Sequence, residues 1–559
     1  MPDEFEKDEM VNVASLLREM ARNQPYTRAV VCPLRQNRDR GMAYAHLTFR
    51  QLDRESDCLA YGLLRHGIKR GTRTILMVKP SLDFFALTFA LFKVGAVPVV
   101  VDPGMGMKGM LNCLSESKAN AFIGISLAQA VRICAPKFFK SINISITVGK
   151  RWFWGGLRLA DIRRTPWKPF PIAKTQKDET AAILFTTGST GPAKGVVYTH
   201  GIFDAQVKHI KNRFDISPGE IDLPTFPLFA LFDPALGMTA VIPDMDPTKP
   251  ARVDPARIIE LILNHGVTNM FASPALLNRV GRYGEAHNIR FPSLKRVISA
   301  GAPALPDNLE RFSQMLNPET EIFPGYGATE AMPVSVMGSH EILQKTRQLS
   351  EQGYGICVGR VLPNLKVRII HINDEPISQW SEDLVIPDGE IGEITVKGDL
   401  VTHRYFQRKR DDLLSKIEES TSIWHRMGDL GWIDTENRLW FCGRKSHRVV
   451  TPDQILFTIP CEAIFNRHPD VFRSALVGVG PRPKQKPVIC IELEKRCRKK
   501  NKQKITEELL ELGQESVITQ GIDTVLFHKA FPVDIRHNSK IFREKLTTWA
   551  KSKVNPNVA

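Results

Sequence analysis

Short apolar runs bounded by glycine or proline alternate with helical patterns through the first half of this 559-residue chain. The runs cover residues 74–78, 96–101, 181–186, 269–272 and 296–299. Runs of this length and uniform apolarity are typical of strands buried on both faces, as in a parallel sheet. Helical patterns are expected at 11–23 and 48–66. The alternation therefore predicts an α/β fold in which helices cover both faces of a largely parallel sheet.

The sequence pattern changes after residue 350. Short strands separated by glycines and acidic turns are expected at 367–371, 392–397, 431–433 and 439–442, which predicts a small β-rich subdomain. After Arg444 a mixed α+β pattern continues for about a hundred residues, a usual size for a separate domain. Because 559 residues are too many for one hydrophobic core, we expect a large N-terminal domain, 1–443, and a small C-terminal domain, 444–559.

The net charge of +16 raises the question of a nucleic-acid partner. Most basic residues are scattered through patterned segments, and the one dense run lies at 495–504. This run has no neighbouring aromatic residue that could stack on a base, so a solvated face is the first interpretation. An acidic partner or a membrane surface comes second, and we expect no nucleic-acid partner.

Cysteine usage and the N-terminus indicate the compartment. The nine cysteines contain no C-x-x-C pair, which disfavours a zinc site or a disulfide framework. The chain begins with several acidic residues, whereas a signal peptide begins with basic ones. The most apolar stretch, 82–101, is interrupted by charged residues, glycine and proline, and predicts a buried helix followed by a strand. We therefore expect a cytoplasmic protein.

Residues 137–159 combine aromatic and basic side chains. Trp152, Phe153 and Trp154 stand beside Lys150 and Arg151. Amphipathic basic stretches of this kind can rest on anionic lipid, so a peripheral membrane contact is one interpretation. A partly buried insertion with a small core of its own is an equal alternative.

A glycine-rich loop follows the predicted strand at 181–186. Residues 185–195 read Phe-Thr-Thr-Gly-Ser-Thr-Gly-Pro-Ala-Lys-Gly. Glycines let the backbone approach a ligand closely, while hydroxyls, backbone amides and one lysine supply donors to phosphate oxygens. The candidate contacts are Thr187, Gly188, Ser189, Thr190, Gly191 and Lys194. This order predicts a phosphate cradle, although Ala193 stands where a Walker A loop has its second glycine.

A second cluster, Gly-Tyr-Gly-Ala-Thr-Glu, occupies residues 325–330. The Tyr326 ring could stack on a purine, and Thr329 with Glu330 supplies a hydroxyl and a carboxylate. One carboxylate together with substrate phosphates is a common way for a protein to hold Mg²⁺. Taken alone, the cluster is equally compatible with a turn followed by an exposed glutamate.

Three further polar residues stand in otherwise ordinary turns. Asp429 and Arg444 could contact the hydroxyls of a sugar, and Lys540 ends a polar loop before a helical pattern. Each residue alone is more often a solvated charge than a functional group.

Taken in this order, the clusters resemble those of the adenylate-forming superfamily, which includes acyl-CoA synthetases, luciferases and peptide-synthetase adenylation domains. The resemblance extends from about residue 47 to residue 543, and includes the segments 93–103, 299–303 and 389–393. It implies the fold of that superfamily, an α/β N-terminal domain that binds ATP and an acyl group, and a mobile α+β lid domain at the C-terminus. It also implies ATP and Mg²⁺ as cofactors and a small carboxylic acid as substrate.

The resemblance implies a role for each matching position. The loop 187–194 would hold the β- and γ-phosphates of ATP, and Asp429 and Arg444 would hold the ribose. Glu330 would bind Mg²⁺. Adenine would be enclosed by Gly301, Ala302, Pro303 and Tyr326, and the catalytic groups would be Lys194, Thr329, Glu330 and Lys540.

Two positions depart from the family pattern. Proline stands one place early in the loop, as Pro192 before Ala193. At the expected hinge after Arg444, where the family usually has Asp or Lys, the chain has Lys445 and Ser446, which leaves the pivot of the lid open.

The segment 222–247 and the tail 532–543 resemble the β-lactone synthetase branch of bacterial olefin biosynthesis. This resemblance implies a long-chain 2-alkyl-3-hydroxy acid whose own 3-hydroxyl attacks the adenylated carboxyl to give a β-lactone, AMP and pyrophosphate. It also implies a lactone decarboxylase and a ketone reductase as pathway partners. Three aromatic residues could line an acyl pocket or simply pack in the core: Phe226, Phe229 and Phe232.

Two alternatives remain open from the sequence. The first is a fatty acyl-CoA ligase, which would use CoA, or a fatty acyl-AMP ligase. The second is a non-catalytic binding protein, which the presence of Lys194, Glu330, Asp429 and Lys540 disfavours.

Overall fold

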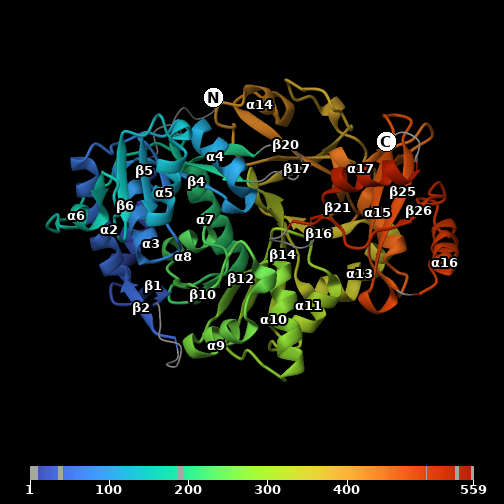
Figure 1. Ribbon diagram of the computed structural model, residues 1–559, viewed down its shortest axis with the longest axis horizontal. Helices are drawn as coiled ribbons and strands as arrows, with labels where there is room; N and C mark the ends of the chain where they lie inside the picture. The colour runs from blue at the N-terminus through green and yellow to red at the C-terminus, as the bar shows by residue number, and fades with distance from the viewer. Residues whose placement is uncertain (1–9, 35–41, 187–192, 499, 535–539, 555–559) are drawn as a thin grey trace.

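The computed structural model describes residues 10–34, 42–186, 193–498, 500–534 and 540–554, and it is a layered α/β structure (Figure 1). The loop contacts predicted at Thr187, Gly188, Ser189, Thr190 and Gly191 lie outside the described residues. In the described part no helix is long and apolar enough to cross a membrane.

The first sheet has seven strands in the described part of the chain and is parallel except at one edge. Its order is β7-β6-β5-β3-β4-β8-β9, and only β8 and β9 pair antiparallel. The strands are β3 (Arg73–Met77), β4 (Val97–Val101), β5 (Ala121–Ile125), β6 (Ile144–Val148), β7 (Leu157–Arg158), β8 (Thr180–Thr186) and β9 (Lys194–Thr199). The glycine-rich loop therefore connects the only two antiparallel neighbours among these strands.

The second sheet contains 14 strands within the described ranges and joins a parallel part to an antiparallel part. The parallel part and its edge are β1 (Arg28–Pro33), β2 (Tyr44–Thr48), β10 (Ile221–Pro224), β11 (Thr239–Val241), β12 (Asn269–Ala272), β13 (Arg296–Ser299) and β14 (Glu321–Ala328). The antiparallel part is β15 (Ala331–Val336), β16 (Ile356–Val361), β17 (Lys366–Ile370), β18 (Gly392–Lys397), β19 (Lys416–Glu419), β20 (Ser422–Ile433) and β21 (Arg438–Arg444).

Strand β14 links the two parts. Its residues 321–324 pair parallel with β13, and its residues 325–328 pair antiparallel with β15. The predicted β-rich subdomain is therefore continuous by hydrogen bonding with the α/β sheet. The Tyr326–Glu330 cluster falls at the point where the pairing changes from parallel to antiparallel.

Helices cover the sheets, and α2 and α3 lie in a core shared by strands of both sheets. A capping box between Thr48 and Gln51 starts α2, and Gly95, at φ 75°, ends α3. The helices are α1 (Ala14–Asn23), α2 (Phe49–Arg65), α3 (Leu82–Val94), α4 (Gly106–Glu116), α5 (Ser126–Cys134), α6 (Leu159–Arg163), α7 (His200–Phe214), α8 (Phe232–Leu236), α9 (Pro255–His265), α10 (Pro274–Ala286), α11 (Pro306–Ser313), α12 (Ser339–Glu341), α13 (Arg347–Leu349), α14 (Lys409–Ser415), α15 (Thr458–Phe465), α16 (Lys502–Gln514) and α17 (Arg543–Val554).

The chain after Arg444, orange to red in Figure 1, has its own cores. Its main strands are β24 (Val471–Val479), β25 (Lys486–Leu493) and β26 (Val525–Phe527), and a short pair is formed by β22 (Val449–Val450) and β23 (Ile455–Leu456). Helices α15, α16 and α17 pack against the larger of these sheets or its neighbours. The domain division at 443/444 stays a prediction.

The join between the two parts is held by a buried ion pair. Lys445 Nζ lies 3.0 Å from Glu393 Oε1 and donates to the carbonyl oxygen of Asn373 at 2.7 Å. Arg426 also donates to Glu393, at 2.7 Å, so one buried carboxylate holds two cations. Burial lowers the pKa of Lys445, and the Glu393 carboxylate opposes that shift.

Candidate active site

A cavity of about 2370 Å³ lies between the large part of the chain and the segment after Arg444. Residues from the first sheet, the second sheet and the C-terminal segment all line it. All of the described residues predicted for the site line this one cavity: Phe226, Phe229, Phe232, Lys194, Gly301, Ala302, Pro303, Tyr326, Thr329, Glu330, Asp429, Arg444 and Lys540. The structure thus brings together residues that are up to about 350 positions apart in the sequence.

Tyr326 and Arg444 form a partly buried polar corner around the buried Asp429. The register of β20 and β21 places Asp429 directly opposite Arg444, and their atoms Oδ1 and Nη1 lie 3.0 Å apart. Tyr326 Oη donates to Asp429 Oδ2 at 2.8 Å. Burial raises the pKa of the Asp429 carboxyl, while Arg444 opposes that shift. Among the described residues, Asp429 Oδ1 receives no well-directed hydrogen bond, so it can accept one from a ligand hydroxyl.

Glu330 lies in a second polar corner, whose other members the sequence analysis missed. Tyr405 Oη donates to Glu330 Oε1 at 2.6 Å, and burial raises the pKa of this tyrosine, with a further contribution from Glu330. Lys416 donates to the Thr402 carbonyl oxygen beside them. Burial lowers the pKa of Lys416 to about 8, against the attraction of Glu330. No local motif marks Tyr405, because the pairing of residues 404–406 with β9 is what brings it here.

Lys194 is engaged in the absence of any ligand. Its Nζ lies 2.7 Å from Asp411 Oδ1 and 4.9 Å from the centre of the Tyr405 ring. Both ends of the ion pair are about a quarter to a third exposed, so the pair faces the cavity in partial contact with solvent. A phosphate bound here would compete with Asp411 for the lysine.

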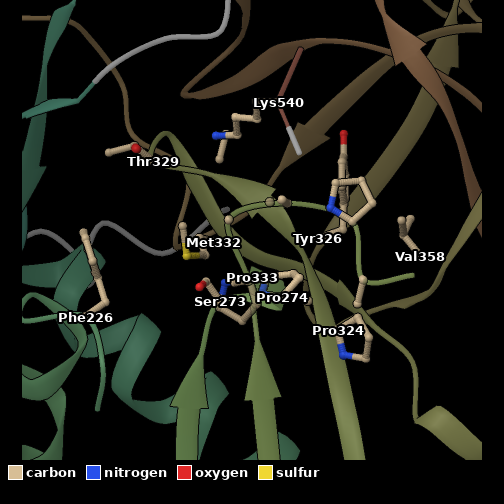
Figure 2. Close-up of a pocket in the computed structure, with 18 of the residues that line it drawn as sticks. Phe226, Ser273, Pro274, Pro324, Tyr326, Thr329, Met332, Pro333, Val358 and Lys540 are labelled. Carbon is tan, nitrogen blue, oxygen red and sulfur yellow. The ribbon is translucent and has the colours of Figure 1, made fainter. Parts of the chain in front are cut away.

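Thr329 stands in the tight hairpin between β14 and β15. Its hydroxyl lies 3.1 Å from that of Thr186 at the end of β8, and Tyr198 donates to its carbonyl oxygen. Gly327 permits the hairpin, because a Cβ there would lie 2.7 Å from the carbonyl oxygen of Ala331. Figure 2 shows the Lys540 side chain extending toward Thr329 from the C-terminal segment.

The end of β13 supplies another part of the wall. Gly301 follows this strand with φ 96°, a conformation that favours glycine, and Ala302 and Pro303 continue the turn along the cavity. Ser299, just before this turn, pairs with Pro324, two residues before Tyr326, and Tyr326 lines the same cavity. Together they form a mostly apolar surface next to the Asp429 corner.

The opposite end of the cavity is mainly apolar. Phe229 stacks on Phe271 with ring centres 4.0 Å apart, and Phe226 and Phe232 lie 5.6 Å and 6.4 Å from Phe229. The three predicted phenylalanines therefore pack on one another and also line the cavity. The two alternatives from the sequence, an acyl pocket and core packing, therefore each describe part of the environment of these residues.

Two buried carboxyls lie in this apolar end, and the sequence analysis assigned them no role. Asp222 and Asp233 are 5% and 3% exposed, and both line the cavity. Burial raises the pKa of Asp222 to about 8 and raises that of Asp233 well above its usual value, with Asp222 adding to the shift. Burial and the neighbouring carboxyl therefore both favour the protonated form of Asp233.

Gln206, on α7, is the third polar group at this end. Its Nε2 donates to the carbonyl oxygen of Met332 at 2.8 Å. It is 5% exposed, and its Oε1 has no hydrogen-bond partner among the described residues. A glutamine within a helical pattern gives no local signal of this position.

Curated relatives match almost the whole chain. The olefin beta-lactone synthetase of Stenotrophomonas maltophilia is 46% identical over 552 residues, which cover 97% of this chain and 98% of the relative. The protein of the same name from Xanthomonas campestris pv. campestris is 45% identical over 557 residues, which cover 98% and 99%. A long-chain-fatty-acid–CoA ligase of Mycobacterium tuberculosis, FadD13, is 24% identical over 479 residues, which cover 84% and 86%.

Solved structures share the fold. The amide bond synthetase McbA of Marinactinospora thermotolerans aligns with a TM-score of 0.77 at 20% identity, covering 96% of this chain and 99% of that one. The O-succinylbenzoate coenzyme A synthetase MenE of Bacillus subtilis, in complex with AMP, aligns with a TM-score of 0.72 at 21% identity, covering 95% and 97%. These matches confirm the predicted fold class.

The family model described as AMP-binding enzyme matches residues 17–406. This range includes the glycine-rich loop and the Tyr326–Glu330 cluster on which the resemblance was based. The chain belongs to the AMP-binding enzyme family.

Proposed function

We propose that this protein adenylates a long-chain 2-alkyl-3-hydroxy acid with ATP and then closes the adenylate to a β-lactone. The observation that supports the proposal most is that Lys194, Glu330, Asp429 and Lys540 line one cavity. The names of the two full-length relatives support the lactone branch.

The described residues fit ATP and Mg²⁺. The Asp429 oxygen that receives no hydrogen bond suits a ribose hydroxyl, and the wall at Gly301 and Tyr326 suits an adenine ring. Glu330 offers a carboxylate beside Thr329, and phosphate oxygens would complete the coordination of a bound ion. When bound, Mg²⁺ would neutralise charge on the phosphates. We retain the loop 187–192 with Lys194 as the proposed contact to the outer phosphates.

In the first step a carboxylate oxygen attacks the α-phosphorus of ATP, and the bond to the bridging oxygen of pyrophosphate breaks. Negative charge accumulates at the α-phosphate during this attack. We assign the stabilisation of this charge to Lys540 and the Thr329 hydroxyl, which both line the cavity. We propose that residues 444–559 act as a lid that carries Lys540 to the site and away from it.

In the second step the 3-hydroxyl oxygen attacks the acyl carbon, and the bond from that carbon to the AMP oxygen breaks. The hydroxyl proton passes to the departing AMP phosphate, which balances the step. CoA is not needed, because the nucleophile belongs to the substrate and is held near the carbonyl. The phenylalanine cluster at the apolar end would hold the alkyl chains.

The competing function is a fatty acyl-CoA ligase or a fatty acyl-AMP ligase. Purified protein is incubated with ATP, Mg²⁺ and a 2-alkyl-3-hydroxy acid, with and without CoA, and the products are identified. We expect lactone, AMP and pyrophosphate in both reactions. A thioester formed only with CoA would establish the ligase instead, and a stable acyl-AMP would establish the acyl-AMP ligase. A lactone decarboxylase and a ketone reductase are the pathway partners that this function would require.

We also propose that an exposed apolar tip, formed by Leu127, Trp152 and Phe153, contacts membrane lipid, where such a substrate would reside. Leu127, Trp152 and Phe153 are 66%, 56% and 81% exposed. Ser126 donates to the Lys150 carbonyl oxygen, which holds α5 beside the aromatic loop. Exposed aromatic side chains next to basic ones suit an anionic bilayer surface.

Vesicle sedimentation tests this contact. We expect the protein to pellet with vesicles containing phosphatidylglycerol, and the double variant Trp152→Ser/Phe153→Ser to pellet several-fold less. Tyr26→Ser is the matched control, since Tyr26 is 74% exposed and lies elsewhere. Equal pelleting of all three proteins would reject the tip as the contact.

A further inference from the structure

Gln206 is a polar side chain in the largely apolar end of the cavity. It belongs to α7 and is 5% exposed, and Phe226 and Met332 line the same space. Polar groups in such a setting are normally hydrogen-bonded, because water cannot reach them easily. The hydrogen bonds of the Gln206 side chain therefore indicate which ligand groups could bind beside it.

The orientation of the Gln206 amide follows from its neighbour. Nε2 donates to the Met332 carbonyl oxygen at 2.8 Å. Turning the amide around would place two oxygens against each other, so Nε2 must face Met332 and Oε1 must face away. Within the described ranges Oε1 has no partner, although Gln206 lines the cavity. Gln206, which lines the cavity, therefore holds a buried amide oxygen that has no donor among the described residues.

This acceptor lies close to the proposed reaction centre. Met332 and Thr329 belong to the same hairpin, and Gln206 donates to Met332. Tyr198 donates to the Thr329 carbonyl oxygen. Burial and Glu330 raise the pKa of the Tyr198 phenol, and a hydrogen bond with the Gln206 side chain opposes that shift. Thr329, Met332 and Lys540 all line the pocket that Figure 2 shows.

We propose that Gln206 Oε1 accepts a hydrogen bond from the 3-hydroxyl of the substrate and is a specificity-determining residue for 3-hydroxy acids. This inference rests on the proposed function. An amide oxygen does not take the proton; it fixes the direction of the O–H bond and leaves a lone pair of the hydroxyl oxygen free to face the activated carbonyl. An acid without the hydroxyl leaves this acceptor buried and unpaired, which is costly.

The second unpaired oxygen of this end, Asp233 Oδ2, is less suited to the role. Asp233 already forms a hydrogen bond with Asp222, and burial together with that neighbour raises the pKa of Asp233. Nothing connects this pair to Thr329 or Met332 by hydrogen bonds in the described structure. The acceptor nearest the hairpin is therefore the amide.

A cycle of two enzymes and two substrates tests the proposal. Wild type and Gln206→Leu are assayed with a 2-alkyl-3-hydroxy acid and with the same acid lacking the hydroxyl. The readout is ATP–pyrophosphate exchange, which reports adenylation before any ring closure. Gln206→Leu also removes the hydrogen bond from Nε2 to Met332, but that loss affects the kcat/KM of both acids equally. The ratio of the two kcat/KM values therefore reports only the contact with the substrate hydroxyl.

We expect wild type to prefer the hydroxy acid roughly tenfold or more, mainly through KM, and Gln206→Leu to bring that ratio close to one. Gln206→Met, which is unbranched, should behave in the same way and serves if the leucine variant does not fold. Gln503→Leu, exposed on α16, is the matched control and should keep the wild-type ratio. An unchanged ratio in the Gln206 variants, or equal losses for both acids, would overturn the proposal.

Failure of the proposed function has a different signature. If wild type exchanged pyrophosphate with neither acid, or formed no lactone from the hydroxy acid, the proposed function itself would be wrong. If wild type formed lactone while the ratio did not depend on position 206, only the role of Gln206 would be wrong.

Discussion

The two ends of the cavity differ in how their polar groups are paired. At the nucleotide end the main charged groups are already paired, as in Asp429 with Arg444 and Lys194 with Asp411. At the acyl end aromatic rings dominate, and the polar atoms Gln206 Oε1 and Asp233 Oδ2 have no partner among the described residues. We infer that the nucleotide binds to charged side chains that are already paired with each other. The choice between acid substrates would depend on the few unpaired polar atoms at the acyl end.

Lys540→Ala should give the largest effect, because it removes the cation at the point where charge develops. We expect adenylation to fall about a hundredfold or more in kcat, with the KM for ATP changed little. Pyrophosphate exchange measures this, and Lys551→Ala, exposed on α17, is the control. If the variant turned over as fast as wild type, Lys540 would have no role in adenylation.

Asp429→Asn should weaken ATP binding without affecting the acid. The change replaces one of the two carboxylate acceptors with an amide donor and leaves the partly buried Arg444 without its counter-charge. We expect the KM for ATP to rise roughly tenfold to a hundredfold and the KM for the acid to stay the same. The exposed Asp388→Asn is the control. A comparable rise in the KM for the acid would mean that the two ends are not separable.

Asp233→Asn tests the acyl end through stability. The folded-state pKa of Asp222 is raised to about 8, so the folded protein holds a proton that the unfolded chain releases above pH 3.8. Stability from this source is present below pH 3.8 and is lost as the pH rises through about 8.

The amide introduced by Asp233→Asn would donate to the Asp222 carboxylate and lower its pKa, so the substitution should flatten this dependence. We expect the variant to gain about 1–2 kcal/mol relative to wild type at pH 8 compared with pH 5. Urea unfolding at the two pH values is the measurement. A slope against pH identical to that of wild type would show that the pair does not share a proton.

Asp411→Asn should have the smallest effect, and in the favourable direction. It frees Lys194 from a partly exposed ion pair, for which ATP must otherwise compete. We expect the KM for ATP to fall by roughly two- to threefold or less, as is usual for partly exposed pairs. Steady-state kinetics at low salt would show this, and a rise in KM would mean that Asp411 orients the lysine instead.

The parallel strands could be predicted well because their apolar runs are continuous. The run expected at 269–272 coincides with β12, and that at 296–299 with β13. In contrast, the strand expected at 431–433 is only the end of β20, Ser422–Ile433. The first part of β20 carries buried His425 and Arg426, whose polarity hides the strand pattern in the sequence.

The same contrast holds within the site. Residues in glycine-rich motifs, such as Tyr326 and Glu330, stand out because the motif requires an unusual local backbone. Contacts between segments far apart in the sequence bring three other residues to the cavity: Tyr405, Gln206 and Asp222. No motif in the neighbouring sequence indicates that these residues line it. Long-range packing, which a single sequence does not display, determines them.

The join at Lys445 has a consequence for the timing of any swing of the C-terminal segment. Turning residues 446–554 about this point would draw the ammonium away from Glu393, leaving Arg426 as the partner of that carboxylate. The movement would therefore first have to break the ion pair between Lys445 and Glu393. Burial already lowers the pKa of the Lys445 amine. In the proposed reaction the hydroxyl that attacks the adenylate belongs to the same molecule as the carboxylate. No second nucleophile has to enter after adenylation, so lactone closure does not require this ion pair to open.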